Sequence, residues 1–127
     1  MRGKRLVGIL VLALLLCAVA PALAADTVVL RVVAVQTDNL DGYLKEIEKG
    51  KTLLKRLGSP AIVRVWQARF AGENAGSVVV GVEYPSLAAF ATAEAKVSAD
   101  AEYQAWIKGL SKLRKVVSDS LYNELKP

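Results

Sequence analysis

The sequence predicts an α+β fold in which a four-stranded antiparallel sheet carries helices on one face. Short runs rich in Val and other β-branched residues recur along the chain, as is typical of strands. Between them lie stretches whose apolar residues recur at three- and four-residue steps, which indicates amphipathic helices. Two of the β-branched runs, within residues 61–84, are joined by the turn-rich AGENAG, and this pattern predicts a hairpin near the middle of the chain.

Residues 1–24 have the features of a secretory signal peptide that precedes the domain. Basic residues near the start are followed by an apolar run over residues 6–20 and by the small-residue cleavage signal Ala22-Leu23-Ala24. The apolar run is shorter than the roughly 20 residues that a membrane span needs. We therefore expect a bacterial Sec-type signal that is cleaved, a periplasmic or secreted protein, and no membrane association after cleavage. An uncleaved N-terminal anchor is the alternative.

Residues 25–127 are expected to form one domain that lacks two of the usual catalytic and metal-binding residue types. The single Cys, Cys17, lies in the predicted signal peptide and the chain has no His, which excludes thiolate or imidazole metal sites and His-based triads. Three of the 17 basic residues also lie in the signal peptide, so the remaining 14 face 12 acidic residues and the net charge falls to +2. That balance gives no support to nucleic-acid binding. We expect no metal, no cofactor and no nucleic-acid partner.

Residues 27–36 predict the first strand, and residues 40–57 the first helix. The strand is apolar on both faces except at Arg31, which indicates that both faces are covered. Asp38 or Asn39 is the expected N-cap of the helix, Gly58 ends it, and Gly50 weakens its middle. The expected core-facing stripe of the helix consists of Leu40, Leu44, Ile47, Leu54 and Leu57.

The two strands of the central hairpin alternate between two different faces. One face is purely aliphatic, with Val63 and Val65 on the first strand and Val80 and Val82 on the second. The other face is also largely apolar but carries charge and a large aromatic ring. Its residues are Ile62, Arg64, Trp66, Val79, Gly81 and Glu83.

The last third of the chain predicts two more helical segments and a final strand. Ser86 is the expected cap of an Ala-rich helix over residues 87–97, whose inward residues are Leu87, Phe90 and Val97. Ser98-Ala99-Asp100 predicts a break before a helix over residues 101–113, in which Trp106 is expected to be a core residue. Residues 115–125 alternate and predict a strand with Ser118, Ser120 and Tyr122 on one side.

The order β–α–β–β–α(α)–β predicts a ferredoxin-like two-layer sandwich. Helices cover only one face of such a sheet, yet the strands are apolar on both faces. The second face therefore needs a partner, and we expect a homodimer through the open sheet face.

The chain resembles the dimeric α+β barrel superfamily, which includes the antibiotic-biosynthesis-monooxygenase-like (ABM), NIPSNAP-like and EthD-like domains. The resemblance rests on the order of elements, the Val-rich strands and the run EYPSLAAFATAEAKVSADAEYQAW, and it covers residues 27–125. It implies a barrel of two sheets with a cavity beneath the helices or at the barrel centre. Haem-degrading members use an axial His that this chain lacks, whereas oxygenase members use Asn, Trp and Tyr residues, among which Trp66 could belong.

We expect Arg31, Arg64, Trp66, Glu83 and Tyr122 to share the sheet face away from the helices. Glu83 would pair with Arg31 or Arg64, because charged side chains are rarely buried unpaired. Such ions either specify the register of the dimer interface or form a pocket for a small anionic or aromatic molecule, in which Glu83 could act as a general base. No catalytic residue is assigned by the sequence.

These features favour an exported dimeric barrel protein that binds a small anionic or aromatic molecule. A cofactor-independent monooxygenase-like or isomerase-like enzyme is the alternative, and the sequence does not decide whether the protein is an enzyme.

Overall fold

The predicted order of strands and helices is confirmed. The computed structural model describes residues 27–127, and the expected signal peptide of residues 1–24 lies outside them. No helix in the described part of the chain is long and apolar enough to cross a membrane. The elements are β1 (Val29–Gln36), α2 (Leu40–Arg56), β2 (Ile62–Gln67), a short 3-10 turn η1 (Gly72–Asn74), β3 (Val78–Tyr84), α3 (Leu87–Ala99), α4 (Ala101–Leu110) and β4 (Lys115–Asn123).

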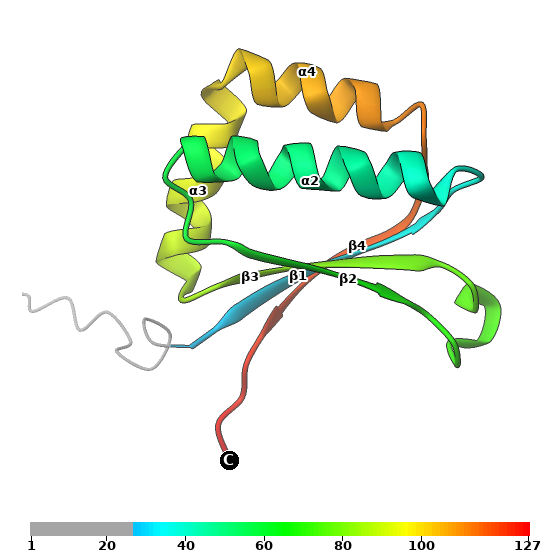
Figure 1. Cartoon of the computed structure of the whole chain (residues 1–127). Coiled ribbons are helices and arrows are strands. Elements are labelled where there is room, and N and C mark those ends of the chain that lie inside the picture. Colours follow the sequence, from blue (N-terminus) through cyan, green and yellow to red (C-terminus); the bar gives the residue numbers. More distant parts are fainter. Residues whose placement is uncertain (1–26) are drawn as a thin grey trace, which may run out of the picture.

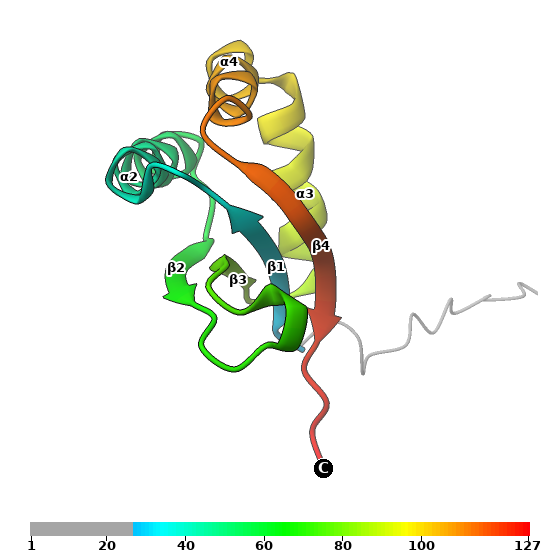
Figure 2. The same ribbon diagram turned by 90° about the vertical axis from the view of Figure 1, so that its right-hand side faces the viewer.

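The strands form one antiparallel sheet in the order β2-β3-β1-β4, which is the ferredoxin-like arrangement. In Figure 1, α2 and α4 lie side by side above the sheet and α3 stands at one end of it, while no helix of residues 27–127 covers the lower face. Figure 2 shows the same layers end-on, with β2 and β4 as the two edges of the curved sheet. One sheet face is therefore under helices and the other is open.

Side-chain caps start α2, α3 and α4, as the sequence predicts. Asn39 accepts a hydrogen bond from the backbone N–H of Gly42 at the start of α2, and Ser86 accepts one from Ala89 at the start of α3. Asp100 ends α3 and also caps α4, where its carboxylate accepts from Tyr103 N–H at 2.9 Å. These acceptors satisfy N–H groups that a helix terminus otherwise leaves unpaired.

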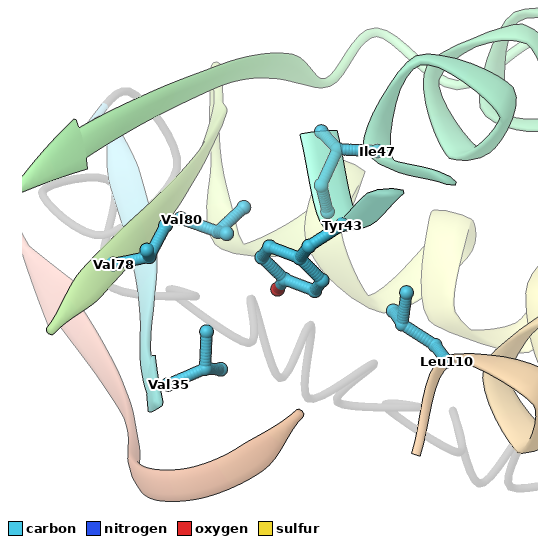
Figure 3. Packing of buried hydrophobic residues seen from close by; sticks show 6 residues of the cluster. All are labelled: Val35, Tyr43, Ile47, Val78, Val80 and Leu110. Carbon is cyan, nitrogen blue, oxygen red and sulfur yellow. The ribbon is translucent and has the colours of Figure 1, made fainter. Parts of the chain in front are cut away.

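The core lies between α2, α4 and the upper face of the sheet, and Tyr43 is at its centre. Its ring is fully buried and points between the strand valines and α4 (Figure 3). The buried cluster consists of Val35, Tyr43, Ile47, Val78, Val80 and Leu110. The predicted stripe of α2 is partly wrong, because Leu40 and Leu44 are exposed and the buried face is instead formed by Tyr43, Ile47, Gly50 and Leu54.

Gly50 is the point at which α4 comes closest to α2. A Cβ at this position would lie 2.4 Å from the Trp106 ring, so the ring occupies the space that any larger residue would fill. The Trp106 indole N–H also donates to the Glu46 carbonyl at 3.1 Å. Gly50 therefore admits the Trp106 side chain, and the expectation that it only weakens the helix is incomplete.

We predict that Gly50→Ala destabilises the protein although Ala is the better helix former. The clash with Trp106 should cost about 1–3 kcal/mol, the usual cost of overpacking, and should exceed the gain of about 1 kcal/mol in helix propensity. Gly109→Ala in α4 is the matched control, because nothing lies within 4 Å of its Cβ position, and it should be neutral or stabilising. Urea unfolding measures both, and an equally stabilised Gly50→Ala would contradict the packing described here.

Candidate functional site

The register between β1 and β3 decides which side chains face the helices. Arg31 lies opposite Val82, Val33 opposite Val80, and Val35 opposite Val78. Residues opposite one another in a sheet point to the same face. Because Val35, Val78 and Val80 belong to the core beneath the helices, the Arg31 side chain is on the helix-covered face as well.

The prediction that all five candidate residues share the open face is therefore wrong for Arg31. Arg64 lies opposite Gly81, and Glu83 lies opposite both Ile62 and Leu30, which places Arg64 and Glu83 on the open face. Side chains alternate along each strand as expected, but the face of β1 that carries Arg31 is continuous with the aliphatic face of the hairpin and not with its charged face. The pairing of Arg31 with Glu83 is excluded by this geometry.

The other four candidates do lie on the open face. Arg64 Nη1 is 3.2 Å from a Glu83 carboxylate oxygen, so this predicted ion pair is present. The Trp66 ring lies over Gly81, where a Cβ would come within 2.5 Å of it. Tyr122 pairs with Leu30 across β4 and β1, and it is 56% exposed. Whether these side chains bind a ligand stays a prediction.

Arg31 instead joins three elements on the helix side of the sheet. Its Nε and Nη2 donate to the two carboxylate oxygens of Asp119 on β4, at 2.9 and 2.7 Å. Its Nη1 donates to Glu94 on α3 at 3.3 Å. The bidentate contact has the strong geometry that a planar guanidinium makes with a carboxylate. Arg31 therefore ties β1 to β4 and to α3, and its charge is balanced by two carboxylates.

These contacts and the surrounding burial shift several pKa values. Hydrogen bonding to Arg31 lowers the pKa of Asp119, so this carboxyl stays ionised. Burial raises the pKa of Tyr84 to about 12, and burial together with the charge of Glu94 raises the pKa of Tyr103. Both tyrosines therefore stay protonated at neutral pH and can donate hydrogen bonds, but they cannot act as bases.

A cavity of about 110 Å³ lies between the sheet and the two helices α2 and α4. Its floor is made of strand valines and its walls are Tyr103, Trp106 and Ile107 of α4. The charged side chains in its lining are three cations, Arg31, Lys51 and Arg114, and one carboxylate, Asp119. The full lining is Arg31, Val33, Ile47, Gly50, Lys51, Leu54, Val63, Val80, Val82, Tyr103, Trp106, Ile107, Leu110, Arg114, Val116 and Asp119.

The cavity combines features that suit a small ligand more than a metal. Apolar and aromatic walls with a few polar groups are typical of small-molecule sites. Within residues 27–127 no group of three or more Cys, Asp or Glu side chains is placed to hold a metal ion. The family resemblance implied a cavity beneath the helices as one possibility, but apart from Arg31 the sequence did not predict its polar residues. They come from β1, β4, α2 and the segment after α4, and no spacing in the sequence links them.

The fold and the cavity beneath its helices define a small ferredoxin-like α+β domain. No family model matches the sequence. No curated protein matches it either. The solved structures similar to it include NIPSNAP-family proteins and a cofactor-independent oxygenase, so the predicted ABM/NIPSNAP-like fold is confirmed.

Three neighbours illustrate the similarity. A NIPSNAP family protein from Agrobacterium tumefaciens is 22% identical, with 80% of this chain and 85% of that chain covered and a TM-score of 0.60. An uncharacterised NIPSNAP domain protein from Burkholderia xenovorans is 16% identical, with coverage of 80% and 94% and a TM-score of 0.59. SnoaB, a cofactor-independent oxygenase from Streptomyces nogalater, is 15% identical, with coverage of 82% and 97% and a TM-score of 0.53. At these identities the likeness establishes the fold alone.

We predict that the Arg31–Asp119 pair makes the free energy of unfolding fall as the pH is lowered into the acidic range. Because the folded-state pKa of Asp119 is lowered, its contribution is present above its unfolded pKa of about 3.9 and is lost as pH falls through the folded value. Asp119→Asn should therefore lose stability at neutral pH and show a shallower fall in unfolding free energy below about pH 4. Urea unfolding across this pH range is the measurement, and parallel curves for both proteins would contradict it.

Proposed function

We propose that this chain is an exported homodimeric barrel protein that binds a small aromatic or anionic molecule in the cavity between its sheet and α2 and α4. The observation that carries the proposal is the cavity itself, in which an aromatic wall and the guanidinium of Arg114 lie over an apolar floor. Export is proposed from residues 1–24 alone. Intact-mass analysis of exported protein tests it, and a species that retains these residues would overturn it.

Two packing features keep the cavity open. Gly50 lets the Trp106 ring sit against α2 and not in the space below it, and the hydrogen bond to the Glu46 carbonyl fixes the plane of that ring. Arg31 is drawn toward Asp119 and Glu94, which keeps its long side chain at the β4 side of the cavity. The side chains of Trp106 and Arg31, which are large enough to fill the cavity, are thus held at its edges by hydrogen bonds.

We predict that p-cresol, a small aromatic probe, binds in this cavity. In a ¹H–¹⁵N NMR titration, the shifts should centre on the Trp106 indole N–H and on the strand valines of the cavity floor. Val82→Phe places a ring in the cavity and should abolish binding, whereas Ala105→Phe adds the same ring to an exposed position on α4 and should leave binding unchanged. Shifts centred on Trp66, or binding that survives Val82→Phe, would contradict the site.

The open sheet face supports the homodimer. Ile62 and Trp66 are each 48% exposed there, beside Leu30, Val32 and Val79 of the central strands. Exposed apolar surface of this kind favours association, and the same face of a second copy supplies a matching surface. The Arg64–Glu83 pair lies within this face, where it could specify the register of the two sheets.

We predict that the protein is a dimer at micromolar concentration and that Val79→Lys breaks it. A charge in the middle of the apolar interface cannot be paired and costs several kcal/mol. Thr52→Lys adds the same side chain to the exposed side of α2 and should leave the dimer intact. Light scattering coupled to gel filtration is the measurement, and a monomeric, folded wild-type protein would overturn the dimer.

A cofactor-independent monooxygenase-like or isomerase-like enzyme is the second candidate. The shared fold with the cofactor-independent oxygenase SnoaB favours it, together with the protonated Tyr103 at the cavity wall as a hydrogen-bond donor. Oxygen uptake with phenolic substrates, or isomerised product without oxygen uptake, would support catalysis. A small molecule that co-purifies unchanged in stoichiometric amount would favour a binding protein.

A further inference from the structure

Arg114 is held in one place by the backbone around it. It lies in the short connection between α4 and β4, where Lys112 N–H donates to the Gly109 carbonyl at 3.2 Å and Leu113 N–H donates to the Leu110 carbonyl at 3.0 Å. The Thr37 hydroxyl donates to the Leu113 carbonyl at 2.7 Å and ties this connection to the end of β1. These three hydrogen bonds fix the backbone on which the Arg114 side chain begins.

Arg114 differs from the other cationic side chains of the cavity in having no carboxylate partner among the described residues. Arg31 is balanced by Asp119 and Glu94, and the Lys51 ammonium group is 2.8 Å from Glu48. The neighbours of Arg114 are the Tyr43 hydroxyl, which accepts from Nη1 at 3.1 Å, and the Tyr43 ring, whose centroid is 6.0 Å from the guanidinium carbon.

The Nε–H of Arg114 is buried and has no acceptor within residues 27–127. A buried donor without a partner costs about 1–3 kcal/mol, and more when it is charged, so such groups generally have a reason. An acceptor that enters with a ligand would satisfy this donor. Because Nε–H and an Nη–H form a planar fork, the best acceptor is a planar pair of oxygens, as in a carboxylate.

We propose that Arg114 anchors the carboxylate of a small aromatic acid whose ring lies in the cavity against Trp106 and Tyr103. This inference rests on the proposed function and names its ligand class. The apolar valine floor and the two aromatic side chains suit a ring, and a volume of about 110 Å³ limits the ligand to about one ring. A phosphate would require more donors than Arg114 provides, since the donors of Arg31 are engaged by carboxylates.

Tyr43 supports the same assignment. It is fully buried in the core, so its hydroxyl is a fixed acceptor that orients one Nη of Arg114 and leaves the Nε edge for a ligand. Asp119 is near enough for its charge to interact with that of Arg114, but both of its oxygens accept hydrogen bonds from Arg31 and not from Arg114. An incoming carboxylate would therefore find a guanidinium edge that no described carboxylate occupies.

The test compares benzoate with benzamide, which has the same shape and no charge. In the NMR titration, the wild-type protein should bind benzoate at least about tenfold more tightly than benzamide. Arg114→Met should remove this preference while benzamide binding is kept, since Met retains apolar packing in place of the Arg stem. Lys112→Met removes one positive charge from an exposed position two residues away and should leave the preference unchanged.

The outcomes separate this inference from the proposed function. Equal binding of benzoate and benzamide by the wild type, or an equal loss of preference in Lys112→Met, would overturn the role of Arg114 while the cavity remains a binding site. Failure of benzamide, benzoate and p-cresol alike would overturn the proposed function as well. If Arg114→Met does not fold, Arg114→Lys replaces it. This variant keeps the charge but loses the fork, and it should weaken benzoate selectively.

Discussion

The contact between Trp106 and Gly50 holds α4 against α2, and the cavity depends on it. A residue with a side chain at position 50 would push the ring away or force it down toward the sheet. The hydrogen bond from the indole to the Glu46 carbonyl fixes the ring in the notch that the glycine leaves. The shape of the cavity on its helix side is therefore determined by Gly50 and Trp106.

The sheet beneath this roof has two faces with different electrostatic arrangements. On the helix side, Arg31 is balanced by two carboxylates, while Arg114 has none in the described chain. On the open side, Arg64 and Glu83 pair with each other within an apolar surface. On the helix side, Arg114 is thus a cavity cation that no described carboxylate contacts through a hydrogen bond, whereas the charges on the open face pair with each other.

The sequence predicts the elements of this fold well and the site poorly, for physical reasons. Caps at Ser86 and Asp100 are local contacts, so nearby residues are sufficient to predict them. The face that Arg31 occupies depends on the register of β1 against β3, which alternation within one strand does not determine. The contact between Arg114 and Tyr43 depends on how α4 packs, and no pattern in the sequence encodes it.

The central claim is that the ligand lies on the helix side of the sheet, against Arg114. The most direct measurement is a crystal structure with 4-bromobenzoate, in which anomalous scattering locates the bromine independently of the protein. We predict bromine density between Trp106 and the strand valines, with the carboxylate at the Nε edge of Arg114. Bromine on the open face beside Trp66 and Arg64 would contradict the account.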